Sequence, residues 1–289
     1  MPALEPGSGA ARADLGFTLK RGDHIDEAVT ELRKAVSLAP DLARAHFHLA
    51  EALSQVGDGS GALAEYQTAA RLSPRDVEYR IKLGMALARA QPAGAVEELR
   101  KAVALDPDNV AAQRALGGVL RRTGENEAAA AAFERARQVS DAQDRQSQAV
   151  LHTNKGIELL KKEKLVEAIE ALRLALAADP RHPAANHYLA IALTATGQWT
   201  QAEPAFVRAL AGAPNDPEIH FNYGVALQRR GNWPRAADEF HACLRLRPGH
   251  PEANCRLAAA LFHVRDNDAA RVALDRARQT GNCQAEPSP

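Results

Sequence analysis

One short pattern returns eight times along the chain at a spacing of about 34 residues, and it constrains the fold more than any local motif does. Each copy contains an alanine, a bulky apolar residue four positions later and a small residue three positions after that. The alanines are Ala28, Ala62, Ala95, Ala129, Ala168, Ala202, Ala236 and Ala270. A period this regular predicts a stack of similar supersecondary units, whose function lies on a surface rather than in one buried pocket.

Each copy predicts a pair of helices. The spacing of four and then three residues places side chains on one face of a helix, which a strand would not do. Upstream lies a second set, typified by Leu83, Gly84 and Leu87, in which a small residue beside a leucine lets a neighbouring helix approach closely. A proline ends the second helix in six of the eight copies. We therefore expect sixteen repeat helices and no sheet.

These positions resemble the tetratricopeptide repeat (TPR) family over about residues 9–282. The resemblance implies an all-α fold, a right-handed α-solenoid (superhelix) of antiparallel helix pairs in which the first helix of each repeat lines a concave inner wall. Three features depart from the family pattern. The third repeat is one residue short in its inner turn, where residues 91–94 replace the usual glycine. Lys155 stands where the fifth repeat should have a leucine, and polar residues replace the usual early aromatic residue of the first helix. The latter are Arg12, His46, Arg80, Gln113, His152, Asn186, His220 and Asn254.

The only irregular junction falls between the fourth and fifth copies. The proline is missing there, and about five extra polar residues appear in the segment 140–148, which lacks glycine and proline. We expect this segment to lengthen the second helix of the fourth repeat rather than to form a flexible linker. The predicted organisation is a disordered end over 1–8, repeats one to four over 9–141, an irregular junction over 142–148, repeats five to eight over 149–282 and a disordered end over 283–289.

The chain shows no pattern typical of an enzyme, a metal site or a cofactor site. It contains no glycine-rich phosphate loop, nucleophile elbow or metalloprotease helix motif. His46 and His48 are two apart on a predicted helix and point about 200° apart, so they do not share an ion. We therefore expect no catalytic residues, no bound metal and no cofactor.

Composition limits the partners and the location. The 36 basic and 36 acidic residues balance, which argues against a general nucleic-acid or membrane-surface role. No apolar stretch is long enough to insert into a membrane. The N-terminus lacks the basic segment and apolar core of a signal peptide, which favours the cytoplasm. A periplasmic location stays open if the chain is part of a longer protein, and the oligomeric state is left undefined.

The leucines set the phase of the TPR pattern and so indicate which positions of the first helices face inward. In the first four repeats, more of these positions are basic than acidic. In the last four, they form an apolar stripe with two asparagines. A concave basic surface prefers an acidic partner. The predicted peptide-binding groove consists of Lys20, Arg21, Arg44, Phe47, Lys82, Arg114, Arg121, Arg122, Asn154, Tyr188, Phe221, Asn222 and Phe262. The alternative for several other apolar members of the stripe is that they pack inside the superhelix.

Two binding modes known in the family fit poorly. No three consecutive repeats carry the lysine, asparagine and arginine set of a carboxylate clamp, and only Asn154 and Asn222 match an asparagine ladder that grips peptide backbone. We expect a non-catalytic scaffold that binds an extended peptide, with an acidic segment, or a partner helix. The alternatives are a substrate-recruiting or regulatory segment of a larger enzyme and, less favoured, an RNA-binding helical-repeat protein.

Overall fold

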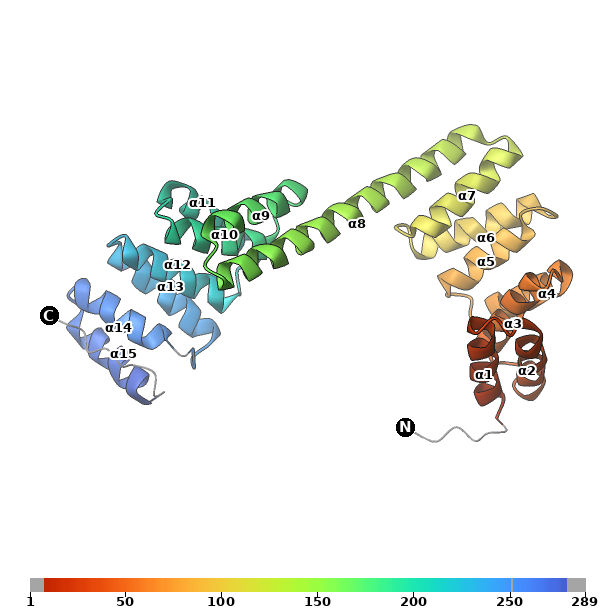
Figure 1. Ribbon diagram of the computed structural model, residues 1–289, viewed down its shortest axis with the longest axis horizontal. Helices are drawn as coiled ribbons and strands as arrows, with labels where there is room; N and C mark the ends of the chain where they lie inside the picture. The colour runs from red at the N-terminus through yellow and green to blue at the C-terminus, as the bar shows by residue number, and fades with distance from the viewer. Residues whose placement is uncertain (1–7, 251, 280–289) are drawn as a thin grey trace. The chain divides into compact units, whose positions relative to one another are not determined.

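The structure, a computed structural model, describes residues 8–250 and 252–279, and within these ranges it contains helices and turns without a strand. The chain forms two compact units, unit 1 ending at Ala142 and unit 2 beginning at Gln143. Figure 1 labels the helices. Unit 1 contains α1 (Gly9–Arg21), α2 (Ile25–Leu38), α3 (Ala43–Gln55), α4 (Gly59–Leu72), α5 (Val77–Leu87), α6 (Pro92–Leu105) and α7 (Val110–Thr123). Unit 2 contains α9 (Leu165–Ala178), α10 (Pro183–Ala195), α11 (Trp199–Gly212), α12 (Pro217–Arg229), α13 (Trp233–Leu246), α14 (Ala253–His263) and α15 (Asn267–Gln279).

The remaining helix, α8 (Asn126–Lys161), spans 36 residues and belongs to both units. It contains the second helix of the fourth repeat, the segment 142–148 and the first helix of the fifth repeat. The described residues therefore form fifteen helices, and the expectation of sixteen is wrong. The physical reason is local, because no glycine or proline between Ser140 and Gln148 ends the helix. Of the predicted disordered ends, Ser8 caps α1 by accepting a hydrogen bond from the Ala11 amide (3.1 Å), and the rest lies outside the described residues.

Within a repeat, the two helices pack antiparallel as a hairpin, and the small residue of the first helix determines how closely they approach. A Cβ atom built on Gly84 of α5 would lie 2.5 Å from Cγ of Leu99 in α6, and one on Gly156 of α8 would lie 2.5 Å from Cγ of Leu172 in α9. Both leucines are fully buried. Each unit is thus a run of helix hairpins packed in sequence, with its core between the helices.

In the second, third and seventh repeats, the polar residue that replaces the early aromatic residue ties the two helices together by hydrogen bonds. In α3, the His46 imidazole lies 2.9 Å from the carbonyl oxygen of Pro40 and 2.5 Å from a carboxylate oxygen of Glu65 in α4. Arg80 makes the same two contacts in the third repeat, donating to Pro74 (2.7 Å) and Glu98 (2.6 Å). His220 repeats them with Pro214 (3.1 Å) and Glu239 (2.6 Å). Directional hydrogen bonds therefore replace ring packing at this position.

The residue just before the small residue of the first helix is exposed in the first repeat of each unit and buried in the other repeats. At this position Leu49, Leu83, Leu116, Leu189, Tyr223 and Leu257 are at most 7 % exposed. In the first repeat Leu15 is 48 % exposed. In the fifth repeat the residue is Lys155, which is also exposed. The departure at Lys155 thus has a structural reason, since the side chain is exposed and a lysine is compatible with water there.

Candidate functional site

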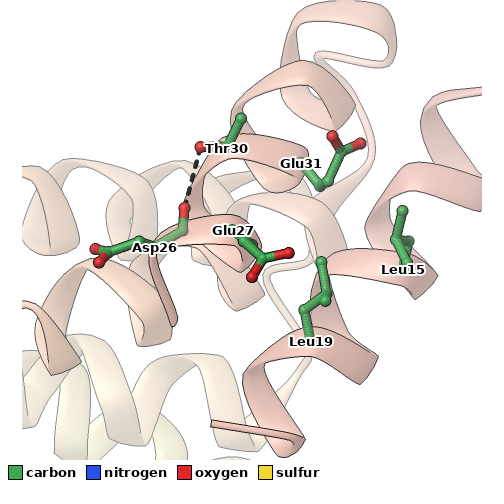
Figure 2. Close-up of a pocket in the computed structure, with 6 residues that line it drawn as sticks. All are labelled: Leu15, Leu19, Asp26, Glu27, Thr30 and Glu31. Carbon is green, nitrogen blue, oxygen red and sulfur yellow. Dashed lines mark hydrogen bonds between the residues drawn. The ribbon is translucent and has the colours of Figure 1, made fainter. Parts of the chain in front are cut away.

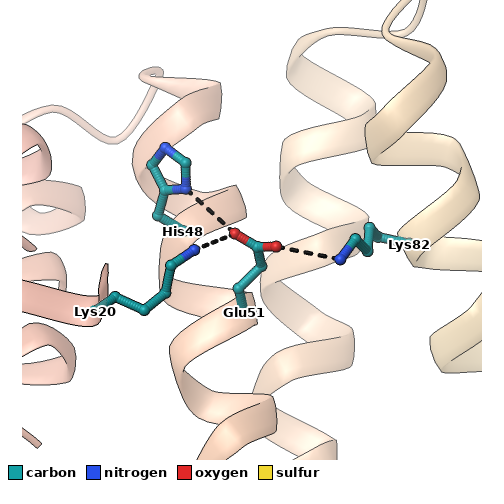
Figure 3. Close-up of polar contacts among 4 residues, drawn as sticks. All are labelled: Lys20, His48, Glu51 and Lys82. Carbon is teal, nitrogen blue, oxygen red and sulfur yellow. Dashed lines mark hydrogen bonds and ion pairs between the residues drawn. The ribbon is translucent and has the colours of Figure 1, made fainter. Parts of the chain in front are cut away.

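The first helices of unit 1 contact each other through charged side chains. Lys20 of α1 and Lys82 of α5 both donate to the carboxylate of Glu51 in α3, with Lys82 Nζ 3.2 Å from Oε1 (Figure 3). His48 Nδ1 lies 3.4 Å from the other carboxylate oxygen. We define the first-helix face of unit 1 as the surface of α1, α3, α5 and α7 on the side that carries Lys20, Glu51 and Lys82.

Glu51 is the electrostatic centre of this surface. Burial alone would raise the pKa of Glu51, but hydrogen bonds from His48, Lys20 and Lys82 outweigh it and lower the pKa to about 2. The carboxylate is therefore ionised at any physiological pH, and it neutralises part of the positive charge of the two lysines.

The basic residues predicted for this surface fall into two groups. Lys20 and Lys82 are held by Glu51, and Arg44 pairs with Asp14 of α1 (3.1 Å). The second group is exposed, and the described residues offer it no ion pair. It consists of Arg21, Arg114, Arg121 and Arg122.

Three members of the second group are oriented by other contacts. The Arg122 guanidinium donates to the carbonyl oxygen of Ala88 (2.6 Å). The guanidinium of Arg121 lies 5.6 Å from the ring centre of Phe133, and that of Arg21 lies 5.9 Å from the ring centre of Phe17. On the first-helix face of unit 1, the positive charge open to a partner therefore lies mainly on α7, because Lys20, Arg44 and Lys82 are compensated internally.

Phe47 does not belong to the candidate site. It is 4 % exposed, stacks on Tyr79 at a ring-centre distance of 4.4 Å and meets Tyr66 edge-on at 5.8 Å. The periodicity placed it at an inward position, but Tyr79 of the next repeat covers it. Its assignment as a peptide contact is corrected to core packing.

In unit 2 the predicted residues of the first helices are half-buried or exposed. The Asn222 amide lies 3.1 Å from His187 Nε2 and donates to the Glu218 carbonyl oxygen (2.9 Å), so its donors already have partners. Tyr188 lies beside His187, with ring centres 5.1 Å apart. Burial lowers the pKa of His187 to about 4, although Asp216 and Glu218 oppose the shift.

The other three predicted residues of unit 2 differ in exposure. Phe221 packs on His250 (4.4 Å between ring centres) and is half-buried. Asn154 and Phe262 are exposed. We call the surface formed by Asn154, Tyr188, Phe221, Asn222 and Phe262 the first-helix face of unit 2.

A pocket of about 420 Å³ lies at a different place, between α1 and α2. Figure 2 shows Glu27 and Glu31 of α2 pointing toward the side on which Leu15 and Leu19 of α1 lie, and Asp26 and Thr30 of α2 also line the pocket. None of the residues predicted from the sequence lines it. The signal that could have found it is the position of Leu15, whose counterparts in other repeats are covered by a preceding helix.

The described residues contain no group of three or more histidine, cysteine, aspartate or glutamate side chains that could hold a metal ion. Among the described helices none is both long and apolar enough to cross a membrane.

Three family models match the chain, each described as a tetratricopeptide repeat. They match residues 18–77 and 86–145, residues 159–230, and residues 217–250. A comparison with curated proteins finds no match.

Solved structures resemble the chain only in their helical-repeat architecture. The first TPR domain of Spaghetti (RPAP3), bound to the HSP90 peptide SRMEEVD, is 22 % identical with a TM-score of 0.40, covering 42 % of this chain and 95 % of that one. A mutant of MamA is 18 % identical with a TM-score of 0.37, covering 71 % and 96 %. The APC/C hetero-tetramer Cut9–Hcn1 is 15 % identical with a TM-score of 0.44, covering 89 % and 50 %. At these values the likeness carries no information about a ligand.

Proposed function

Because the chain belongs to the tetratricopeptide repeat family, we propose that it is a non-catalytic scaffold that binds protein partners through the first-helix faces of its two units. The ligand of unit 1 is an extended peptide or helix with an acidic segment. The ligand surface of unit 2 is more apolar, and Tyr188 and Phe262 are its principal contacts.

The observation that carries this proposal is the exposed arginine group of α7. Arg114 and Arg121 are seven residues apart and project from one side of the helix, with Arg122 beside them. Unlike Lys20, Lys82 and Arg44, none of the three has an acidic partner among the described residues. Arginines presented in this way bind carboxylates in paired, directional hydrogen bonds.

The test measures the binding of pools of fluorescent peptides, one rich in glutamate and one rich in lysine, by fluorescence anisotropy over a range of salt concentrations. We expect the glutamate-rich pool alone to bind, and more weakly as salt rises, because salt screens exposed charges. The triple variant R114E/R121E/R122E should bind the glutamate-rich pool more weakly and with a flatter salt dependence.

A matched control reverses three exposed arginines of the second helices and turns of unit 1. The variant R33E/R71E/R75E changes the net charge equally but should keep most of the affinity. Equal losses in the two triple variants would mean that net charge, rather than the first-helix face, attracts the peptide. Strong binding of the lysine-rich pool would also contradict the proposal.

Glu51→Gln gives an independent test of the same surface. The change removes the carboxylate that holds Lys20 and Lys82, so both amines become available to a ligand. We expect tighter binding of the glutamate-rich pool. Unchanged affinity in a folded Glu51→Gln protein would restrict the ligand to α7.

Tyr188→Ala and Phe262→Ala test unit 2. Each should weaken binding of an aromatic-rich peptide pool with little change in salt dependence, since apolar contacts act mainly through the dissociation rate. Phe221 is a poor probe, because its packing on His250 makes loss of structure a second cause of weaker binding.

A further inference from the structure

At the N-terminal end of unit 1, a leucine position that six other repeats bury is exposed. We call the surface around this position the head face and define it as Leu15, Leu19, Asp26 and Glu27. Leu15 is 48 % exposed, whereas its six buried counterparts are at most 7 % exposed, and the pocket between α1 and α2 lies beside it (Figure 2). The fifth repeat has the exposed Lys155 at this position, so a large exposed leucine here is specific to the first repeat.

The structure also indicates what kind of element covers such a surface. In the middle of each unit, the second helix of one repeat packs on the first helix of the next, as α2 does on α3 and α13 does on α14. The covering helix makes this contact with two residues, which lie one and eight positions after the repeat alanine. Val36 occupies the later position in α2 and packs against the cluster of Ala13, Ala35 and Ala45, the last of which lies in α3. Both positions are apolar in five of the six covering helices, which carry Val29 and Val36, Leu63 and Ala70, Val96 and Val103, Ile169 and Leu176, and Ala237 and Leu244. In α11 they are Glu203 and Leu210, and Glu203 accepts a hydrogen bond from the Tyr223 hydroxyl of α12 (3.1 Å).

The same two positions in the last helix are basic. They hold Arg271 and Arg278 of α15, and both side chains are exposed. Within the described part of the chain, the ion-pair contact of Arg278 is a long one, 3.8 Å to Asp275. We call this surface the tail face.

The head and tail faces are complementary in charge. Asp26 and Glu27 are exposed acids that line the pocket with Leu15, and Glu27 also lies 3.3 Å from His24 Nδ1. The tail face offers two arginines whose aliphatic stems can cover a leucine while their charged ends reach the acids. We propose that a second copy of this chain docks here, with α15 of one molecule packing on α1 and α2 of the next. This arrangement repeats between molecules the packing that each unit already uses between its repeats.

A head-to-tail contact is heterologous, so it joins molecules into open chains or rings rather than into a closed two-fold dimer. Sedimentation velocity over a wide concentration series should therefore show a mass that rises beyond a dimer and falls as salt is added. Leu15→Lys, which copies the residue of the fifth repeat, should raise the dissociation constant about tenfold or more, because one buried leucine contributes a factor of this size. Leu174→Lys, at a leucine on α9 that is 55 % exposed, is the matched control and should leave association unchanged.

Two variants that block opposite ends give the decisive measurement. Leu15→Lys blocks the head face, and R271E/R278E blocks the tail face. Each variant alone should stay monomeric, while an equimolar mixture should form a dimer and nothing larger, since one head face and one tail face remain open.

Three results would overturn the proposal. The native chain could remain monomeric throughout the series, which would leave the head face to a different occupant. The R271E/R278E variant could still dimerise by itself, which would indicate a two-fold contact between two head faces. The mixture could fail to form dimers although circular dichroism shows both variants folded, which would exclude α15 as the partner.

Discussion

Gly84→Ala tests the close approach of the helices on which the fold depends. The new Cβ atom would lie 2.5 Å from Leu99 Cγ, 2.9 Å from Cδ2 and 3.2 Å from Cδ1. Carbon atoms in ordinary contact are about 3.5–4.0 Å apart, so the overlap is about 1 Å. Cγ is the centre of the leucine side chain, and Leu99 is fully buried, so relief requires α5 and α6 to separate. Overpacking of this kind costs about 1–3 kcal/mol.

The exchange of glycine for alanine in a helix offsets part of this cost by about 1 kcal/mol. The expected net effect is a loss of about 0–2 kcal/mol in the free energy of unfolding of unit 1. The matched control is Gly118→Ala in α7, where an added Cβ atom meets nothing within 4 Å. This variant should gain about 0.5–1 kcal/mol, because only the helix propensity changes.

The assay must separate the two units. Both tryptophans, Trp199 and Trp233, lie in unit 2, so tryptophan fluorescence during urea unfolding should be the same in both variants and in the native chain. In Gly84→Ala, peptides from α5 and α6 should exchange their amide hydrogens faster than in the native chain. In Gly118→Ala, peptides from α7 should exchange more slowly. Stabilisation by Gly84→Ala, equal to that by Gly118→Ala, would refute the close approach of the two helices.

Two further predictions concern unit 2 and are read by its tryptophans. Phe206→Ala removes a fully buried ring stacked on Tyr223 with ring centres 4.9 Å apart, and should lower the free energy of unfolding by about 3–5 kcal/mol. Amide hydrogen exchange should become faster only in the neighbouring repeats, and equal effects in α1 and α15 would contradict stacking between neighbours. The hydrogen bond to Glu239 raises the pKa of His220 from 6.5 despite opposing burial, so its stabilisation is complete below pH 6.5 and is lost as pH rises through the folded pKa. Burial lowers the pKa of His187 to about 4, so its contribution is present above pH 6.5 and is lost as pH falls towards 4. Urea midpoints across this pH range should lose the high-pH slope in His220→Asn and the low-pH slope in His187→Asn; slopes that persist in both variants would assign the dependence to other groups.

The repeat skeleton could be read from the sequence because its spacing is local. Ala202, Phe206 and Ala209 lie on one helix, and their separations of four and three residues already predict a buried face, which the structure confirms. The α-solenoid fold follows from the same pattern repeated along the chain. The continuous α8 was harder to predict, because one missing proline and a polar segment are compatible with both an extended helix and a short turn.

The details of the candidate site depend on residues far apart in the chain. The phase of the repeat predicts that Lys20, Glu51 and Lys82 share a surface, but not that the two lysines converge on one carboxylate 31 residues from each. Phe47 was placed on the groove for the same reason, because burial by Tyr79 depends on the angle between adjacent repeats. The peptide contacts of Arg114, Arg121, Arg122 and Tyr188 remain predictions.

The charged residues at the ends of the two units determine where the array could be lengthened. A repeat duplicated between α4 and α5 would pack against Leu63 and Ala70 of α4 on one side and against Leu83 of α5 on the other. Both contacts are apolar, so the repeat should insert without loss of solubility. A repeat added after the fourth would instead meet the exposed Arg137 on α8, and one added before the fifth would meet Lys155. Growth by tandem duplication is thus open inside each unit and disfavoured at the junction between the fourth and fifth repeats.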